Sequence, residues 1–274
     1  MRSPPSTRLE LARRARLDAE LVRRGLARSR DHAATLIAAG RVKVGGTVAT
    51  KPATGVDLAT AVLVEEVEGE QWVSRGAHKL LGALEAFAYD PTGKRVLDAG
   101  ASTGGFTDVL LRRGAAHVVA VDVGYGLIDW SLRTDVRVTV VERVNARALD
   151  PGQVGEPVDL VVADLSFIPL GLVLPALVGC AKPGADFLPM VKPQFEVGKD
   201  KLPSGGVVRD PQARAGAVRK VAEQAVALGL GVRGVVASPL PGPSGNVEFF
   251  LWLTAGAPPL EEADLQRAVA DGPT

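Results

Sequence analysis

Cysteine, histidine and aromatic residues are scarce in this sequence, and each scarcity excludes a class of site. Cys180 is the single cysteine, so no disulfide can form within the chain. It falls in the apolar run LVLPALVGCA, where a buried thiol is expected rather than a nucleophile. The three histidines stand at positions 32, 78 and 117, without the spacing of metal ligands. We therefore expect no metal centre.

A secretory leader and a membrane-spanning run are also missing. The first ten residues, MRSPPSTRLE, carry charge but are not followed by an apolar segment. The longest apolar stretch, residues 169–181, contains two prolines and is too short to span a bilayer. The composition, 46% hydrophobic and 23% charged, is that of an ordinary globular protein. These features predict a cytoplasmic protein with no membrane partner.

The formal net charge of +1 conceals an asymmetry along the chain. Residues 1–51 hold 12 Lys or Arg and 4 Asp or Glu, whereas the remaining residues hold 20 and 27. A small basic module joined to a larger acidic one indicates that the first module binds a polyanion. A disordered basic tail is the alternative, and it accounts for residues 2–14 but not for the patterned segments that follow.

The basic part has the pattern of a small α+β module. Apolar residues at helical spacing predict helices over 16–26 and 29–40, with Ser29 as an N-cap and with Gly25 and Gly40 at the ends. The sequence RVKVGGTVA alternates around a Gly-Gly turn and predicts a hairpin, and 58–67 predicts a further strand. Residues 51–56 are interpreted as a connection.

From Lys94 onward, apolar strands alternate with helices, which predicts a doubly wound, mostly parallel sheet. In the linker, Trp72 and Val73 are expected to anchor the chain against one domain. The expected organisation is a flexible basic tail (1–14), a small α+β domain (15–66), a linker (67–77), an α/β domain (78–256) and a flexible tail (257–274).

The segment LDAGASTGGFTDVLL follows a predicted strand and opens a helix, as a ligand-binding loop does. Ser102 replaces the second glycine of the dinucleotide fingerprint, and the pattern is nearer to D-x-G-x-x-x-G-G, a form common where S-adenosylmethionine binds. Asp122 lies 22 positions after Gly100, where a carboxylate meets ribose hydroxyls. Another ligand of a Rossmann-like domain stays open as a minority reading.

Three polar residues stand at strand ends that are expected to share one edge of the sheet. Asp164 ends the strand DLVVAD and Lys192 ends FLPMVK, while Glu248 begins NVEFFLWL. Ligands bind at the carboxyl ends of parallel strands, and an antiparallel last strand would begin at that same edge. Each residue alone reads as a solvated charge, but their shared placement favours a catalytic site.

Their chemistry suits transfer of a methyl group to an alcohol. A hydroxyl must lose its proton as it attacks, and a lysine accepts a proton only as the neutral amine. Desolvation and a second nearby cation both favour the neutral amine. A second cation is therefore expected near Lys192. Carboxylates would hold the amines and the hydroxyl in place, although they also favour the charged amine.

Several longer motifs resemble those of one family. RLDAELVRRGLARSR, SRGAHKL, LDAGASTGGFTDVLL, VADLSF, VKPQFEVGK and SPLPGPSGNVEFFLWL are similar to the TlyA (haemolysin A) family of bacterial ribosomal RNA 2′-O-methyltransferases over about residues 15–255. The resemblance implies a Rossmann-like, S-adenosylmethionine-dependent methyltransferase domain preceded by an S4-like RNA-binding domain. It also implies a Lys-Asp-Lys-Glu tetrad at Lys79, Asp164, Lys192 and Glu248. Lys79 thus becomes the expected cation near Lys192, and His78 is expected to be structural.

The same resemblance implies further ligand contacts. For S-adenosylmethionine they are Asp98, Gly100, Ser102, Thr103, Gly104, Gly105, Phe106, Asp122, Val123 and Asn145. For phosphates of ribosomal RNA they are Arg16, Arg28, Arg30, Arg41, Lys43 and Lys51, which would give affinity rather than base identity.

The resemblance implies, as substrates, cytidine riboses of 16S and 23S RNA in ribosomal subunits, with susceptibility to capreomycin-type drugs as a consequence. One departure is Glu70, where actinobacterial members have a basic residue before the linker tryptophan. The alternatives are a membrane-lytic protein, as the name haemolysin suggests, and a non-catalytic RNA-binding factor.

Overall fold

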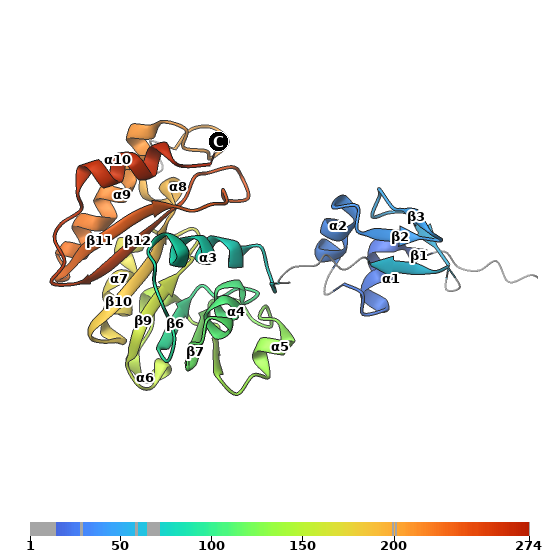
Figure 1. Ribbon diagram of the computed structural model, residues 1–274, viewed down its shortest axis with the longest axis horizontal. Helices are drawn as coiled ribbons and strands as arrows, with labels where there is room; N and C mark the ends of the chain where they lie inside the picture. Colours follow the sequence, from blue (N-terminus) through green and yellow to red (C-terminus); the bar gives the residue numbers. More distant parts are fainter. Residues whose placement is uncertain are drawn as a thin grey trace, which may run out of the picture. The chain divides into compact units, whose positions relative to one another are not determined.

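The computed structural model describes residues 15–27, 30–57, 60–64, 72–198, 200 and 202–273. The chain divides into two compact units, residues 1–70 and 71–274 (Figure 1). The predicted N-cap Ser29, the predicted RNA ligand Arg28 and the linker residue Glu70 lie outside the described residues, as do the first fourteen.

The first unit has the predicted α+β composition. Its three-stranded antiparallel sheet has the order β3-β2-β5, and a second pair joins β1 to β4. Leu17 and Leu21 of one helix and Ala33, Leu36 and Ile37 of the other are buried together, as the helical spacing predicts. The elements are β1 (Ala15–Arg16), α1 (Leu17–Arg23), α2 (Arg30–Ala38), β2 (Val42–Val44), β3 (Thr47–Val48), β4 (Gly55–Val56) and β5 (Val62–Val64).

The β1–β4 pair corrects the reading of 51–56 as a plain connection, because Val56 pairs with Ala15 and is buried. Its strands are only two residues long, too short to leave an alternating pattern in the sequence.

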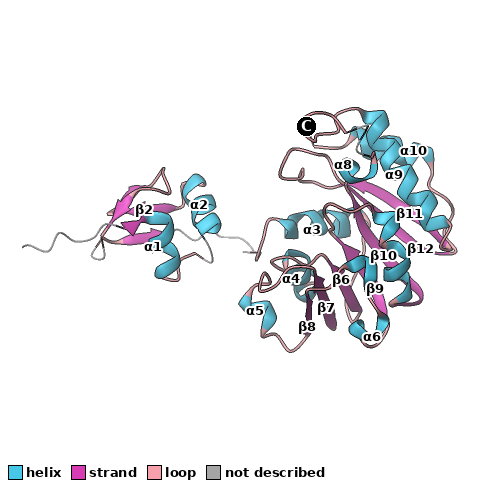
Figure 2. Cartoon of the chain, turned by 180° about the vertical axis from the view of Figure 1, so that it is seen from behind, coloured by secondary structure: helices cyan, strands magenta, loops and turns pink. Residues whose placement is uncertain are grey.

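The second unit is built on a seven-stranded sheet of order β11-β12-β10-β9-β6-β7-β8 (Figures 1 and 2). Neighbours from β10 to β8 are parallel, and β12 runs antiparallel to both β10 and β11, which confirms the predicted topology. The strands are β6 (Arg95–Ala99), β7 (His117–Asp122), β8 (Val138–Glu142), β9 (Val158–Ala163), β10 (Ala181–Val191), β11 (Leu230–Ala237) and β12 (Phe249–Ala255).

Helices cover both faces of this sheet, so successive strand residues enter opposite cores. On β12, Phe249 and Leu251 belong to one core and Phe250 to the other. The first core includes residues of η1 (Ala146–Ala148), α7 (Leu174–Gly179), α9 (Pro211–Val226) and α10 (Glu262–Ala270). The second includes α3 (Gly76–Ala86), α4 (Gly105–Arg112) and Leu132 of α5 (Trp130–Arg133). Short helices α6 (Pro151–Val154), η2 (Leu170–Leu172) and α8 (Pro193–Glu196) lie in the connections.

The C-terminal segment, expected to be a flexible tail, instead contains the ordered helix α10. Leu265, Ala268 and Val269 recur at helical spacing and are buried in the first core. The segment DLQRAVA carried this signal, but its polar flanks obscured it. Among the described residues, no helix is both long enough and apolar enough to cross a bilayer.

Candidate active site

A pocket of about 410 Å³ lies at the carboxyl ends of the parallel strands of the second unit. Its wall is formed by the start of α3, the loop after β6, residues that follow β9 and β10, and the loop before β12. Three predicted catalytic residues, Lys79, Asp164 and Lys192, line it. Of the predicted cofactor ligands, those that line it are Gly100, Ser102, Thr103, Gly105 and Phe106.

Two glycines allow separate segments to meet at this pocket. At Gly100, where φ is 87°, an added Cβ would overlap the carbonyl oxygen of Asp164. At Gly105, an added Cβ would overlap Ser74 Oγ and would lie 2.9 Å from Ala77 N. A side chain at either position would push the segments apart. The loop therefore packs directly against the segment of Asp164 and the segment SRGAHKL.

The Asp122 carboxylate fastens the other side of the loop to the end of β7. Its Oδ2 accepts a hydrogen bond from Ser102 N at 2.8 Å, and its Oδ1 accepts one from Gly124 N at 2.6 Å. The side chain is partly exposed, so lone pairs remain that could accept from ribose hydroxyls. This is the placement that the spacing from Gly100 predicts.

Asp98 lies behind the loop rather than on the pocket wall. It is fully buried at the end of β6, and Thr107 Oγ1 of α4 donates to its Oδ2 at 2.7 Å. Burial, opposed by the hydrogen bonds of Thr107 and assisted by the charges of Asp164 and Asp122, raises the pKa of Asp98 to about 7. The geometry thus gives Asp98 a supporting position, joining strand to helix under the loop.

The remaining predicted cofactor residues also stand outside the pocket wall. Gly104 forms the left-handed turn before α4. Val123 is exposed after β7, and Asn145 is exposed after β8, where its side chain accepts from Arg147 N. These positions at neighbouring strand ends are compatible with an extended ligand that reaches beyond the pocket.

Lys79 and Glu248 form the first of two lysine–carboxylate pairs. Lys79 is on the first turn of α3, and Glu248 immediately precedes β12. Their Nζ and Oε2 atoms are 2.5 Å apart, with Lys79 only 9% exposed and Glu248 fully buried. His78 is exposed instead, because successive helix residues point in different directions. The antiparallel course of β12 is what brings Glu248 to this edge.

Lys192 and Asp164 form the second pair. The Lys192 Nζ lies 2.5 Å from Asp164 Oδ1 as an ion pair and donates a hydrogen bond to Ser166 Oγ at 3.0 Å. Lys192 is 8% exposed, so its amine has lost most of its water. Ser166 was missed by sequence reasoning, although its place two residues after Asp164 in ADLSF was a usable signal.

The two pairs bring four chemically suited side chains from distant segments to one place. Both amines line the same pocket, as expected of a second cation near Lys192. Sequence reasoning also missed part of the wall, formed by Ser74, Arg75 and the loop residues Leu240, Pro241 and Pro243. The site can bind a polar ligand, hold a hydroxyl group and move a proton.

The predicted RNA ligands of the first unit are organised by acidic neighbours. Asp18 Oδ2 accepts from Arg16 and from Arg30, both at 2.9 Å, while both arginine side chains stay more than half exposed. Hydrogen bonds from Arg16 hold the pKa of Asp18 well below its usual range. Lys51 is exposed, and Arg41 and Lys43 are partly exposed.

The pocket suits S-adenosylmethionine on its own geometry. Backbone of the glycine loop forms one wall without side chains that would fill it, since Gly100 and Gly105 both line the pocket. The Asp122 carboxylate stands beside that loop, and the ring of Phe106 packs behind it against Phe250 at 5.9 Å between centroids. The loop would hold the methionine part, and the carboxylate would meet the ribose hydroxyls.

Comparison with known proteins agrees with this reading. The family model for FtsJ-like methyltransferases matches residues 72–255, and the S4 domain matches residues 15–62. A relative from Mycobacterium tuberculosis, named 16S/23S rRNA (cytidine-2′-O)-methyltransferase TlyA, is 63% identical over 96% of this chain and 100% of its own length. The Campylobacter jejuni relative named 23S rRNA (cytidine-2′-O)-methyltransferase TlyA is 34% identical over 71% of this chain and 76% of its own.

A solved structure described as "Putative hemolysin from Streptococcus thermophilus" superposes with a TM-score of 0.75 at 35% identity, covering 94% of this chain and 95% of that chain. The match therefore extends over both units in sequence length. With these relatives and both family models in agreement, the chain belongs to the TlyA family of FtsJ-like methyltransferases that carry an S4 domain.

Proposed function

We propose that this chain transfers a methyl group from S-adenosylmethionine to the 2′-hydroxyl of cytidines in 16S and 23S ribosomal RNA. The observation that carries the proposal is the convergence of two lysine–carboxylate pairs, each with a buried amine, on the pocket beside the glycine loop. The name and the full-length match of the Mycobacterium tuberculosis relative support both RNA substrates. Such an enzyme would meet its ribosomal subunits in the cytoplasm.

Proton removal is the work we assign to Lys192. S-adenosylmethionine, when bound, supplies an electrophilic methyl group. As the ribose oxygen attacks that methyl group, the Lys192 amine would accept the 2′-hydroxyl proton, and S-adenosylhomocysteine would be the leaving group. Lys79 lies on the wall of the same pocket, where its ion pair with Glu248 holds it. Ser166 fixes the direction of the amine through its hydrogen bond.

The carboxylates keep these amines in position. Glu248 is fully buried at the start of β12 and holds Lys79 on the pocket wall. Asp164 follows β9, and its partly exposed side chain stands beside both the pocket and Lys192. Asp164 is thus placed to hold the ribose hydroxyl as well as the amine. Removing either carboxylate would release a buried amine and misplace it.

The S4 unit supplies affinity for the substrate. Exposed side chains of Arg16, Arg30 and Lys51 would contact phosphates, which position RNA without reading its bases. The target cytidine would be chosen by RNA shape and by extrusion into the pocket.

The test is single-turnover methylation of purified 30S and 50S subunits with labelled S-adenosylmethionine. The wild-type protein is expected to label cytidine riboses in both subunits, and Lys192→Met to lower the rate constant by roughly 100-fold or more. Lys182→Met is the matched control, because Lys182 lies on β10, the strand that Lys192 follows, and pairs with Asp159 at 2.7 Å, outside the pocket.

Equal rates for Lys192→Met and wild type would remove Lys192 from the mechanism. Labelling of bases instead of riboses would overturn the proposed reaction. Labelling of 50S subunits alone would restrict the substrate to 23S RNA.

A further inference from the structure

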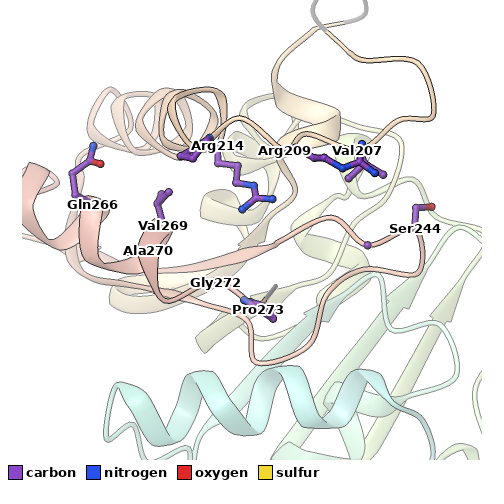
Figure 3. A pocket seen from close by; sticks show the side chains of 11 residues that line it. Val207, Arg209, Arg214, Ser244, Gln266, Val269, Ala270, Gly272 and Pro273 are labelled. Atoms are coloured by element: carbon purple, nitrogen blue, oxygen red, sulfur yellow. The ribbon is translucent and has the colours of Figure 1, made fainter.

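A second cavity, of about 630 Å³, lies apart from the methyltransferase pocket (Figure 3). It opens to solvent and is lined by the segment before α9, the first turn of α9, the helix α10 with the residues after it, and the loop between β11 and β12. Its polar side chains are Arg209, Arg214, Ser244 and Gln266. No carboxylate is found among the described residues that line it. The cavity therefore has the lining of an anion site.

Arg214 is the central group of this cavity. Its side chain extends from α9 into the space between α10 and the loop that carries Ser244 (Figure 3). Nε donates to the Val208 carbonyl at 2.9 Å, which fixes the plane of the guanidinium and leaves its terminal N–H groups directed elsewhere. Burial lowers the pKa of Arg214 from its ordinary value. This guanidinium has thus lost part of its water.

No ion pair offsets that loss in the described part of the chain, where Arg214 has no carboxylate within salt-bridge distance. Arg219, five residues later on the same helix, is paired with Glu262 at 2.8 Å. A partly buried guanidinium without a counter-ion is costly, and an anion that accepts its free N–H groups would recover the free energy. Arg209 adds a second cation at the cavity.

The acidic residue next to Arg209, Asp210, does not lie in the cavity as a counter-ion for Arg214. Asp210 separates Arg209 from α9, but its Oδ1 caps the helix by accepting from Gln212 N at 3.1 Å. Asp210 is exposed and is not part of the cavity wall.

One anchored loop forms part of the wall of both cavities. Pro241 and Pro243 line the pocket that holds Lys79 and Lys192, the methyltransferase pocket. Ser244 and Gly245 line the cavity that holds Arg209 and Arg214, the arginine cavity. Asn246, 2% exposed, fastens this loop by donating to the Gly206 carbonyl and accepting from Val208 N, both at 2.9 Å. A polyanion that enters the pocket with one nucleotide would therefore pass the arginine cavity with an adjacent part of its backbone.

We propose that the Arg209–Arg214 cavity binds a backbone phosphate of ribosomal RNA next to the target nucleotide. This inference rests on the proposed function, since it assumes an RNA substrate in the methyltransferase pocket. The ligand chemistry is a phosphate oxyanion held by a guanidinium, in which charge-assisted hydrogen bonds are strong. A free phosphate has the same chemistry, so the experiment separates the two sources.

The experiment compares Arg214→Gln, Arg209→Gln and the control Arg219→Gln, which removes the same charge from the other, paired arginine of α9. Affinity for ribosomal subunits is measured between 50 and 200 mM salt with the full-length chain. Each cavity variant is expected to lower the salt-dependence slope by about 1 and to weaken binding about tenfold at 150 mM salt. The control is expected to keep the wild-type slope.

Slopes equal to that of Arg219→Gln for both cavity variants would overturn the proposal. Arg209 is exposed, so its variant tests the idea even where Arg214→Gln fails to fold. Thermal stabilisation by inorganic phosphate that is lost in Arg214→Gln, together with unchanged subunit binding, would reassign the cavity to a free anion. Methylation by the wild-type protein decides the proposed function separately, whichever result the variants give.

Discussion

The fully buried carboxyl of Asp98 makes a pH-dependent prediction that can be tested by one substitution, Asp98→Asn. The pKa of Asp98 is about 7 in the folded protein, chiefly because burial disfavours the charged form, and it is about 4 in an unfolded chain. The folded state therefore binds the proton more tightly. Accordingly, the contribution of Asp98 to the free energy of unfolding falls as the pH rises from about 4 to about 7 and is level above that range.

The magnitude follows from the difference between the two pKa values. A difference of about 3 costs the wild-type protein about 4 kcal/mol above pH 7, of which about 3 kcal/mol is lost between pH 5 and pH 8. Asparagine keeps an acceptor for the Thr107 hydroxyl but does not titrate. Its amide would replace Oδ1, which is buried without a hydrogen-bond partner, at a cost of roughly 1–3 kcal/mol. At pH 8 the variant is thus expected to be more stable by about 1–3 kcal/mol.

Urea unfolding at pH 5, 6, 7 and 8 measures this difference in the second unit, because Trp72, Trp130 and Trp252 are all in it and report by fluorescence. Asp159→Asn is the control, because a hydrogen bond from Lys182 holds the pKa of Asp159 below its usual value. The contribution of Asp159 to the free energy of unfolding is therefore lost only as the pH falls below about 4, outside the range that is measured. Parallel stability profiles of wild type and Asp98→Asn between pH 5 and pH 8 would refute the reasoning.

Two further predictions concern the contacts that organise each unit. Gly105→Ala would force a methyl group against Ser74 and Ala77. We expect this substitution to lower the free energy of unfolding by about 1–3 kcal/mol and to weaken S-adenosylmethionine binding at least tenfold, as measured by calorimetry. Unchanged affinity would show that the close packing at Gly105 is dispensable. Asp18→Asn makes the first unit more positive but releases Arg16 and Arg30 from their shared carboxylate, so RNA binding in filter assays should weaken. Asp31→Asn, at an exposed site, is the control for the change in charge. Tighter RNA binding by Asp18→Asn than by Asp31→Asn would show that charge alone governs affinity.

Elements whose signals are local can be predicted from the amino-acid sequence. The alternation of apolar strands with helices predicts the parallel sheet, and the glycine pattern at Gly100–Gly105 predicts the ligand loop. Both signals come from residues that are neighbours in the sequence. The strand-end positions of Asp164 and Lys192 were also readable, since the carboxyl ends of parallel strands share an edge. The prediction of a flexible C-terminal tail is wrong for α10, whose short apolar stripe lies between polar flanks.

Which distant side chains become partners depends on the tertiary structure. Lys79 and Glu248 are separated by 169 positions in sequence, yet they form a buried pair because β12 runs antiparallel and begins beside α3. Ser166 likewise accepts a hydrogen bond from Lys192 only because the segments after β9 and β10 meet in the folded chain. The Arg209–Arg214 cavity forms where α9, α10 and the loop before β12 meet. Burial, and with it the raised pKa of Asp98, depends on everything packed around a group, which no local pattern records.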